Sequence, residues 1–350
     1  MSKKSIVITG AAGFMGLEFL KQALEKTDYN IICIDAMTYA ANEEAFWKEV
    51  SLHKQKRVII CQQKIQNIAV YWKKVLDEHN IKYVFNFAAE SHVDNSNEDG
   101  TPFVESNILG TYNLVEYMRN NHPELKCFFQ ISTDEVYGMS YNVNFRQETA
   151  GLPDDYLENN DYNPTSYYAA SKASAEMFVK SASKVWNFPY IITRSCNNFG
   201  PFQHIEKLIP KFLKNMILGI SFPLYGDGKQ LRQWVSSARH AECLIELMKA
   251  VEGTFIETNQ IFNIGGIQME NLELIDKLMT AIQKSENKGL LDSSYDRPGH
   301  DLAYNLNSTK LDKLVGEYTK ERFEKELSQT VNFYSEKFTH ESFDREYEWS

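Results

Sequence analysis

A short apolar strand, a glycine-rich turn and an amphipathic helix open the chain, and together they constrain its fold more than any other feature. The strand covers residues 5–9, the turn 10–16 and the helical pattern 17–24. Glycines at positions 10, 13 and 16 permit a tight turn and let the backbone approach a pyrophosphate. The phosphates then meet the free N–H groups at the helix N-terminus. This strand–turn–helix context predicts a dinucleotide-binding site.

A second apolar strand, residues 30–34, ends at Asp35. The spacing matches the fingerprint, in which an acidic residue follows about 20 residues after the glycines. A carboxylate there accepts hydrogen bonds from the adenosine ribose and repels a 2′-phosphate. The sequence therefore predicts NAD as the cofactor in preference to NADP.

Strands and helices alternate along the first part of the chain. Further strands are expected at 57–60, 83–87, 127–131 and 190–194, with helical segments between them. Repeating β-α units of this kind form a doubly wound parallel sheet. We expect an α/β protein with a Rossmann-type NAD-binding domain that carries the catalytic residues (1–195). A smaller, mainly substrate-binding domain of mixed α/β structure should follow (196–350), with some segments interleaved.

Composition excludes several classes of protein. A net charge of −10 over 350 residues argues against a nucleic-acid-binding surface. No apolar run reaches the ~18–20 residues of a membrane span, and the N-terminus shows no signal-peptide pattern. Five widely spaced cysteines suit a reducing compartment, without the clusters that indicate a metal. We expect a cytoplasmic protein with no metal site and no nucleic-acid or membrane partner.

Residues able to carry chemistry follow the strand at 127–131. A hydroxyl pair and two adjacent carboxylates, Ser132-Thr133-Asp134-Glu135, come directly after it. Ligands in an open parallel sheet bind just beyond the carboxyl ends of the strands. We therefore expect Thr133, Asp134 and Glu135 at the lip of a cleft. The alternative is a solvated turn, in which an Asp-Glu pair needs no further explanation.

A tyrosine and a lysine four residues apart, Tyr168 and Lys172, share one face of the next predicted helix. A nearby ammonium stabilises a phenolate, so we expect Lys172 to lower the pKa of Tyr168. Tyr167 is a competing candidate, but its offset of five residues from Lys172 turns it away. After a glycine turn and a Ser/Thr strand end, this pair indicates a catalytic tyrosine.

Taken together, these motifs resemble the extended short-chain dehydrogenase/reductases, and more narrowly the nucleotide-sugar 4,6-dehydratases typified by the dTDP-glucose enzymes. The similarity runs over about residues 5–334. The motifs that carry it are Thr-Gly-x-x-Gly-Phe-x-Gly at 9–16, Asp35 with Thr38-Tyr39, Ala-Ala-Glu-Ser-His-Val-Asp at 88–94, Ser-Thr-Asp-Glu-Val-Tyr-Gly at 132–138, Tyr-x-Ala-Ser-Lys at 168–172, Asn-Asn-x-Gly-Pro at 197–201, Glu-Lys-Leu-Ile-Pro at 206–210 and Arg-Pro-Gly-His-Asp at 297–301.

The resemblance implies that an NDP-glucose, dTDP- or UDP-linked, loses water to give the NDP-4-keto-6-deoxyhexose through internal hydride transfer by bound NAD. Tyr168 would take the C4 hydroxyl proton, Lys172 would hold the nicotinamide ribose, and Thr133 would position the C4 oxygen. Glu135 would remove the C5 proton while Asp134 protonates the departing C6 hydroxyl, which requires carboxyl groups in opposite protonation states. Related epimerases lack the Asp-Glu pair because they eliminate nothing.

The resemblance also implies binding residues and an assembly. A homodimer would form through the helices around 107–118 and 168–185, where Ala173, Ala175, Met177 and Phe178 supply apolar surface. The expected cofactor-binding residues are Gly10, Gly13, Phe14, Met15, Gly16, Asp35, Ala36, Met37, Thr38, Phe87, Ala88, Ala89, Ser91, Ser106, Tyr168, Lys172 and Asn198. The expected substrate-binding residues are Ser91, His92, Thr133, Asn197, Lys207, Leu208, Pro223, Leu224, Tyr225, Arg232, Asn263, Arg297 and His300.

Two other functions stay open. One is a nucleotide-sugar epimerase or a dehydratase of an NDP-N-acetylhexosamine. The other is a non-catalytic NAD-binding sensor or scaffold, against which the intact set of Thr133, Tyr168 and Lys172 argues. The chain also departs from the family pattern, because Lys64 stands where an aspartate usually bonds the adenine amine. Further departures are Tyr167, Gln233 and Arg239, so the base and the hexose are not fixed by the resemblance.

Overall fold

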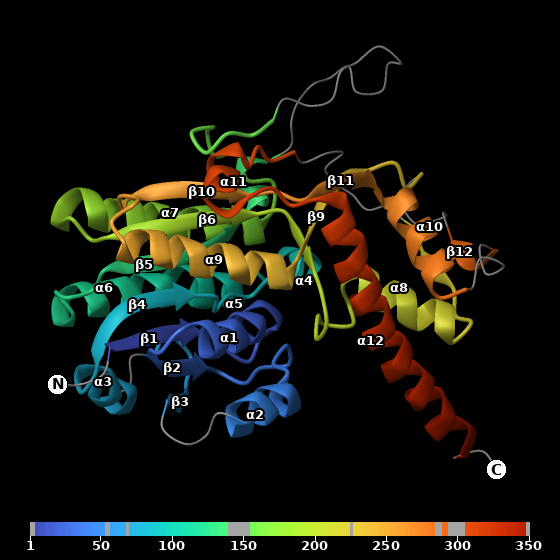
Figure 1. Ribbon diagram of the computed structural model, residues 1–350, viewed down its shortest axis with the longest axis horizontal. Helices are drawn as coiled ribbons and strands as arrows, with labels where there is room; N and C mark the ends of the chain where they lie inside the picture. The colour runs from blue at the N-terminus through green and yellow to red at the C-terminus, as the bar shows by residue number, and fades with distance from the viewer. Residues whose placement is uncertain are drawn as a thin grey trace.

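The computed structural model describes residues 4–52, 57–67, 70–138, 155–224, 227–283, 289–292 and 305–347. At its centre lies a seven-stranded sheet in which every neighbouring pair of strands is parallel (Figure 1). The order confirms the predicted doubly wound, Rossmann-type α/β fold. Across the sheet the strands are β10 (Gln260–Ile264), β6 (Tyr190–Ser195), β5 (Cys127–Thr133), β4 (Asn80–Asn86), β1 (Lys4–Thr9), β2 (Asn30–Asp35) and β3 (Val58–Gln62).

Helices cover both faces of this sheet because its strands are apolar on both sides. In β1, Ile6 and Ile8 pack into one core and Val7 into the other, as alternating strand side chains must. The helices of the first face are α1 (Phe14–Lys26), α2 (Glu43–Leu52), α9 (Ser237–Glu252) and α11 (Thr309–Val315). Those of the second face are α3 (Val70–Asp77), α6 (Thr111–Asn121) and α7 (Tyr167–Trp186).

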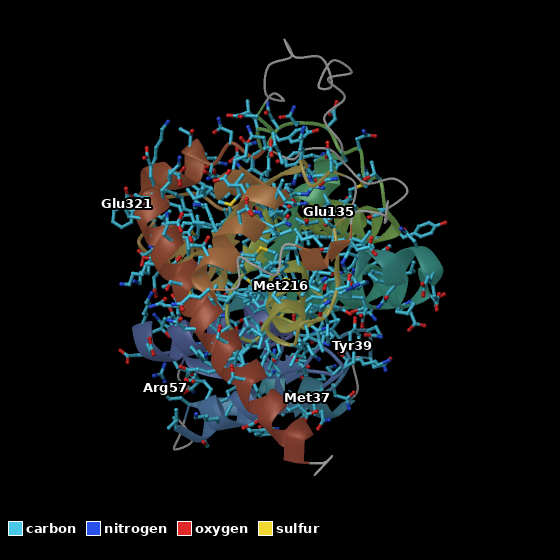
Figure 2. The ribbon with its side chains drawn as sticks, turned by 90° about the vertical axis from the view of Figure 1, so that its right-hand side faces the viewer. Met37, Tyr39, Arg57, Glu135, Met216 and Glu321 are labelled. Carbon is cyan, nitrogen blue, oxygen red and sulfur yellow. The ribbon has the colours of Figure 1, made fainter. Side chains whose placement is uncertain are left out.

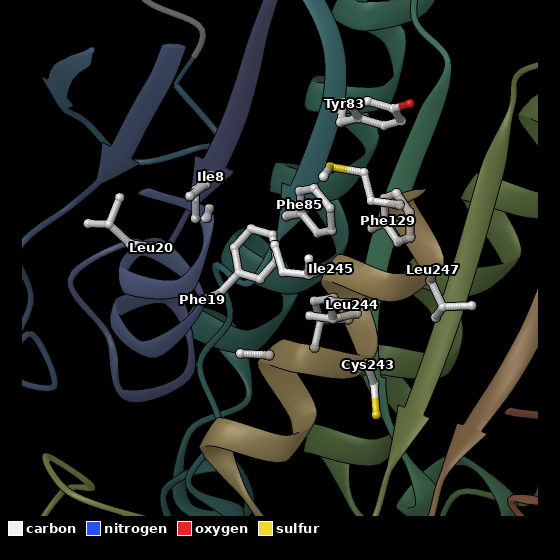
Figure 3. Close-up of a cluster of buried hydrophobic side chains, with 14 of the residues drawn as sticks. Ile8, Phe19, Leu20, Tyr83, Phe85, Phe129, Cys243, Leu244, Ile245 and Leu247 are labelled. Carbon is white, nitrogen blue, oxygen red and sulfur yellow. The ribbon is translucent and has the colours of Figure 1, made fainter. Parts of the chain in front are cut away.

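Aromatic rings form the centre of the first core (Figure 3). The ring of Phe85 lies 4.2 Å from that of Phe19 and 4.3 Å from that of Phe129, measured between centroids. Leu244 and Ile245 of α9 close over them and are entirely buried. A helix from the second half of the chain therefore completes the core of the large sheet.

A second unit lies next to the carboxyl ends of the strands of the large sheet, on the side of the molecule away from the N-terminus (Figure 1). Its apolar core includes Phe212, Leu278 and Phe323. The elements of this unit are β7 (Asn197–Phe199), β9 (Leu231–Ser236) and β11 (Ile267–Glu270) in one sheet, β8 (Phe222–Pro223) with β12 (Leu291–Asp292), and the helices α8 (Leu208–Ile217), α10 (Asn271–Ala281) and α12 (Lys320–Tyr347).

Short helices follow β4 and β5 at the carboxyl ends of these strands. The helix expected around residue 107 begins as a π-helix, which the sequence pattern did not predict. These elements are α4 (Val93–Glu98), α5 (Thr101–Phe103), the π-helix η1 (Val104–Gly110) and the 3₁₀-helix η2 (Asp134–Tyr137).

An apolar face on α6 and α7 is left exposed by the protomer. Met177 and Phe178 are 49% and 42% exposed, and the Phe178 ring lies 5.5 Å from that of the exposed Tyr112. Ala173 and Ala175, expected to add to this surface, are buried instead. That part of the prediction is wrong, because small residues on the inner side of α7 let the helix lie close to the sheet.

Candidate active site

The turn between β1 and α1 is packed against the end of β4. Gly10 has a φ of +66°, and a Cβ built on it would lie 2.8 Å from the backbone nitrogen of Ala88. A Cβ on Gly16 would lie 2.0 Å from the carbonyl oxygen of Gly10. Only glycine fits these two positions. The turn therefore presents bare backbone at the N-terminus of α1, as a pyrophosphate requires.

Asp35 ends β2, and its carboxylate is fixed by backbone N–H groups. Its Oδ2 accepts a 2.8 Å hydrogen bond from the N–H of Ala12, and its Oδ1 accepts one of 2.8 Å from the N–H of Met37. Burial raises the pKa of Asp35, and these N–H groups oppose the rise. A carboxylate has about four lone-pair sites, so the oriented group can still accept ribose hydroxyls.

A cavity of about 160 Å³ lies beside Asp35 at the carboxyl ends of β1, β2 and β4. Its wall of small residues and oriented backbone fits a dinucleotide. From the predicted cofactor set it includes Gly10, Gly13, Asp35, Ala36, Thr38, Phe87, Ala88, Ala89 and Ser106, but not Phe14, Met15, Gly16, Met37, Ser91, Tyr168, Lys172 or Asn198. Wall residues that the sequence reasoning missed include Gln63, Gln66, Pro102 and Glu105.

The predicted catalytic residues meet where β5 ends and α7 begins. The hydroxyl of Thr133 donates to Asp134 Oδ1 at 3.2 Å and accepts from the N–H of Glu135 at 3.3 Å. The side chain of Tyr168, in the first turn of α7, lies close to Thr133, whose hydroxyl opposes the rise in the pKa of Tyr168. Viewed from this edge of the sheet, Glu135 lies above Met37 (Figure 2). The catalytic group and the cofactor cavity thus lie at one side of the molecule.

Asp134 and Glu135 differ in their surroundings as the sequence suggested. Asp134 is 3% exposed, while Glu135 is only partly buried. Burial, assisted by the charge of Glu135, raises the pKa of Asp134 to about 7, and Arg232 opposes the rise. Asp134 can therefore carry a proton near neutral pH, as a general acid must.

The expected effect of Lys172 on Tyr168 is wrong. The ammonium Nζ of Lys172 donates to the carbonyl oxygen of Ile131 at 2.6 Å, and burial lowers the pKa of Lys172 to about 8. Desolvation and the charges of Glu135 and Asp134 raise the pKa of Tyr168. Tyr168 is therefore a protonated phenol near neutral pH in this arrangement.

The first of the predicted substrate residues lie between the two units of the fold. Lys207 Nζ donates to the carbonyl oxygen of Ser91 at 3.3 Å, and His92 Nε2 lies 3.6 Å from Glu206 Oε2. These contacts join the segment after β4 to the start of α8. The remaining ones in this region are Asn197 at the start of β7, Leu208 at the start of α8, Pro223 in β8 and Arg232, buried in β9.

Two predicted substrate residues make contacts within the chain. Asn263 is fully buried; its Oδ1 accepts from the hydroxyl of Tyr137 and its Nδ2 donates to the carbonyl oxygen of Tyr156, both at 2.8 Å. This amide therefore joins β10 to η2 and to the segment around Tyr156. Leu224 packs in the apolar core of the second unit. Tyr225, Arg297 and His300 lie outside the described residues.

Asn198 is held by a histidine that the sequence reasoning missed. Its Nδ2 donates to the Ser195 hydroxyl at 3.0 Å, and its Oδ1 lies 2.9 Å from His240 Nδ1. Burial lowers the pKa of His240 to about 3, so the imidazole is neutral and donates this bond. The only local signal was a histidine at the start of a predicted helix.

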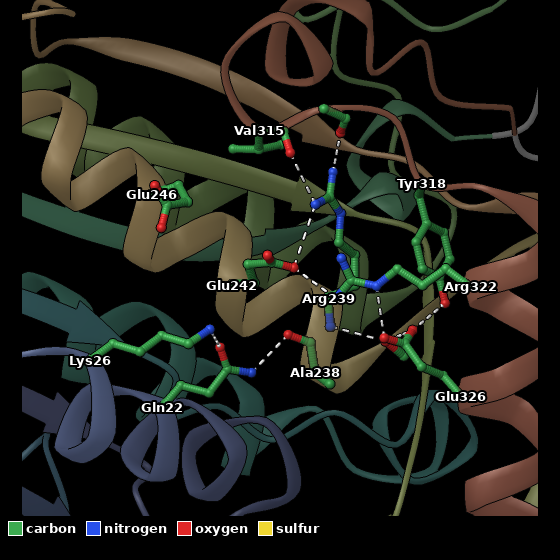
Figure 4. Close-up of polar contacts among 12 residues, drawn as sticks. Gln22, Lys26, Ala238, Arg239, Glu242, Glu246, Val315, Tyr318, Arg322 and Glu326 are labelled. Carbon is green, nitrogen blue, oxygen red and sulfur yellow. Dashed lines mark hydrogen bonds and ion pairs between the residues drawn. The ribbon is translucent and has the colours of Figure 1, made fainter.

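Arg239, a departure from the family pattern, anchors the C-terminal segments (Figure 4). It donates to the carbonyl oxygens of Val315 and Gly316 and pairs with Glu242 at 3.5 Å. Arg322 of α12 contacts the same carboxylate at 2.7 Å. Arg239 therefore ties α9 to the end of α11 and to α12.

Of the other departures from the family pattern, Gln233 makes contacts within the fold and Lys64 lines the cavity. Gln233 donates to Asn305 Oδ1 and accepts from the N–H of Leu306, both at 2.9 Å, so it holds that segment. Lys64 lines the cavity together with Glu90, and its charge opposes the rise in the pKa of Glu90 that burial causes. Of the four departures, Lys64 therefore lines the cavity expected to hold the cofactor, and Tyr167 is exposed.

The part of the chain that the structure describes contains no helix long and apolar enough to cross a membrane. Within the same ranges, no group of three or more His, Cys, Asp or Glu residues could hold a metal ion. All five cysteines are buried and free.

The geometry is that of a dinucleotide-binding Rossmann protein, and comparison with known proteins refines this class. The NAD dependent epimerase/dehydratase family matches residues 6–265. Escherichia coli dTDP-glucose 4,6-dehydratase 1 is 34% identical over 94% of this chain and 92% of its own. The low-salt glycan biosynthesis protein Agl12 of Haloferax volcanii is also 34% identical, over 94% of this chain and 98% of its own.

Solved structures agree with the curated relatives. DesIV, a dTDP-glucose 4,6-dehydratase from Streptomyces venezuelae solved with NAD and TYD bound, superposes with a TM-score of 0.82. Its sequence is 30% identical, and the match covers 95% of this chain and 97% of that one. The chain belongs to the NAD dependent epimerase/dehydratase family. The predicted family and its NAD cofactor are confirmed.

Proposed function

We propose that this chain is a nucleotide-sugar 4,6-dehydratase that converts dTDP- or UDP-glucose into the NDP-4-keto-6-deoxyhexose and water. The observation that carries the proposal is the unequal pair Asp134 and Glu135 next to Thr133 and Tyr168. Burial raises the pKa of Asp134 to about 7, which suits an acid that must donate near neutral pH. Epimerisation eliminates no water and has no use for such a pair. The similarity to dTDP-glucose 4,6-dehydratases supports the same choice.

When bound, NAD accepts hydride from C4 of the sugar and returns it to C6. The chain's own residues would hold it along one edge of the sheet. The glycine turn receives the pyrophosphate, Asp35 accepts the adenosine ribose hydroxyls, and Lys172 and Asn198 lie toward the nicotinamide end. The glycine backbone and the oriented Asp35 carboxylate described above support the first two of these roles, and the resemblance to the family implies the roles of Lys172 and Asn198.

The catalytic side chains divide the proton transfers among them. Thr133 and Tyr168 lie close together and would converge on the C4 oxygen, where Tyr168 as the phenolate would accept the hydroxyl proton while C4 is oxidised. The positive charge of a bound oxidised nicotinamide would oppose the burial that raises the pKa of Tyr168. The resulting ketone acidifies C5–H, and Glu135 removes that proton. Asp134 donates its proton to the departing C6 hydroxyl, which leaves as water. Arg232, which acts electrostatically on Asp134, stabilises the carboxylate that remains.

The proposal extends to the organisation of the protein. Residues 1–195 would form the cofactor unit and 196–350 mainly the substrate unit, with α9 and β10 returning to the cofactor unit. Two copies would pair through the exposed apolar face on α6 and α7. The protein would act in the cytoplasm on a small soluble substrate.

Mass spectrometry of the purified protein incubated separately with dTDP-glucose, UDP-glucose and UDP-N-acetylglucosamine tests the function. A product lighter by one water from a glucose nucleotide supports the proposal. Loss of water from the N-acetylhexosamine alone would indicate the related dehydratase, and a stereoisomer of unchanged mass, seen by NMR, an epimerase. Bound dinucleotide without turnover of any of these would indicate a sensor. Tyr168→Phe is the matched inactive control.

A further inference from the structure

A buried carboxylate behind the catalytic residues takes no part in the chemistry described above. Glu176 lies on α7 one turn beyond Lys172 and has no exposed surface. We propose that Glu176 is a positioning residue that supplies the counter-charge to the Lys172 ammonium and fixes the carboxyl end of β5. The inference rests on the proposed function, because it assumes that Tyr168 and Lys172 are used.

Arg194 holds the Glu176 carboxylate in one orientation. Arg194 is 1% exposed; its Nη2 lies 2.8 Å from Glu176 Oε2, and its Nε lies 3.2 Å from both carboxylate oxygens. The hydroxyl of Tyr162 donates to Oε2 at 2.8 Å. The rings of Tyr137 and Tyr162 lie 4.5 and 4.7 Å from the guanidinium. Such paired, charge-assisted bonds fix geometry as well as charge.

The same carboxylate holds the strand that carries the catalytic group. The hydroxyl of Ser132 donates to Glu176 Oε1 at 2.5 Å. Ser132 immediately precedes Thr133 and is in register with Arg194 on the neighbouring strand. Glu176 therefore joins β5, β6 and α7 directly behind Thr133. Any movement of Ser132 would displace the neighbouring hydroxyl of Thr133, which lies close to Tyr168.

The charge of Glu176 also acts on Lys172. Burial lowers the pKa of Lys172 to about 8, and the Glu176 carboxylate works in the opposite direction. The other ionisable groups around these strand ends include Tyr168 and Lys180 on the same helix, Asp134, Glu135 and Tyr137 on η2, Arg194 on β6, and Tyr162. A buried ion pair contributes little net stability compared with an apolar pair. The pair of Glu176 and Arg194 matters here because it orients the carboxylate that holds Ser132.

The test compares Glu176→Gln with the wild type. Glutamine keeps the shape and removes the charge, so we expect the pKa of Lys172 to fall further. The alkaline limb of the turnover–pH profile should then move to lower pH by about one unit. The pH dependence of NAD binding to the dinucleotide-free protein, measured by calorimetry, should move in the same direction. Glu176→Asp, which restores the charge, should recover most of the shift.

Two further variants separate the roles. Ser132→Ala removes the strand contact but not the charge, so turnover should fall about tenfold with the pH limb unmoved. Glu116→Gln breaks a partly exposed pair with Arg119 and should change nothing. Superimposable pH profiles for a folded Glu176→Gln protein, or full activity of Ser132→Ala should Glu176→Gln not fold, would overturn the inference. A wild-type protein that binds NAD but dehydrates no nucleotide sugar would overturn the proposed function instead, and the binding profile would still decide the role of Glu176.

Discussion

The cofactor end and the catalytic end of the candidate site use different chemical groups. The cofactor end uses backbone: glycines at positions 10, 13 and 16 leave the backbone of the turn uncovered, and Asp35 is oriented by the N–H groups of Ala12 and Met37. The catalytic end uses buried ionisable side chains, among them Asp134 and Lys172 with shifted pKa values. Binding of the pyrophosphate at the first end should respond to shape and hardly to pH. Chemistry at the second should respond strongly to charge, and the charges should cost stability.

Removing one carboxyl group at the catalytic end should have the largest effect. Asp134→Asn and Glu135→Gln should each reduce turnover by at least about 100-fold, because general acid and general base assistance each contribute roughly 10²–10⁴-fold. Oxidation at C4 uses Tyr168 and Lys172, so both variants should accumulate reduced nicotinamide absorbance when substrate is added.

Tyr168→Phe should give the opposite pattern, with little turnover and no such absorbance. Circular dichroism should show that all three variants are folded. Near wild-type dehydration by both carboxamide variants would show that the Asp-Glu pair is an ordinary turn.

Gly13→Val should break the cofactor end without touching a charge. A Cβ at this position meets only the carbonyl oxygen of Gly10, at 3.3 Å, so the side chain projects mainly into the pyrophosphate site. We expect the purified variant to retain less than a tenth of the wild-type dinucleotide, measured by absorbance after denaturation. Gly289→Ala, which meets nothing within 4 Å, is the control. Wild-type dinucleotide content in Gly13→Val would place the pyrophosphate elsewhere.

Asp134→Asn should also stabilise the protein, in a pH-dependent way. The pKa of Asp134 is raised in the folded state from 3.8 to about 7. The free energy of unfolding of the wild-type protein therefore decreases as the pH rises through that interval. An asparagine has no charge to bury. Urea unfolding should show little difference between the two proteins at pH 4 and an advantage for the variant of about 1–3 kcal/mol at pH 8. A difference independent of pH would mean that Asp134 is not the buried acid.

The smallest effect is expected away from both ends. Phe178→Asp places a charge on the exposed apolar face of α6 and α7 and should convert a dimer to a monomer in light scattering at micromolar concentration. Turnover per protomer should fall less than about threefold, because the face is outside the site. Leu52→Asp, which alters a more exposed apolar residue on α2, should leave the mass unchanged. A monomeric wild-type protein would contradict the proposed assembly.

Local spacing explains which parts of the site could be predicted. Gly10 to Gly16, Asp35 and the pair Tyr168 and Lys172 lie at fixed distances in the sequence, and each follows a strand or begins a helix. The alternation of strands and helices likewise predicted the large sheet. The short strands β7, β11 and β12 have too few residues to show a period.

Contacts between distant residues left no signal in the sequence. Glu176 meets Ser132 44 positions away, and Asn263 meets Tyr137 126 positions away. The error about the pKa of Tyr168 has the same origin, because the carbonyl group of Ile131, 41 positions from Lys172, takes its ammonium as a hydrogen-bond donor. Such pairings depend on how elements pack, which periodicity does not encode.

The return of α9 and β10 to the large sheet bears on how the protein can be made and re-engineered. When the ribosome has completed β6, the named catalytic residues are present, but the outer edge of that strand has no partner and the aromatic core lacks Leu244 and Ile245. An unpaired strand edge beside an open apolar core is prone to aggregation. Expression of residues 1–195 alone should therefore give insoluble protein. Grafting a substrate unit from a relative should succeed only if residues 237–264 stay with their native sheet.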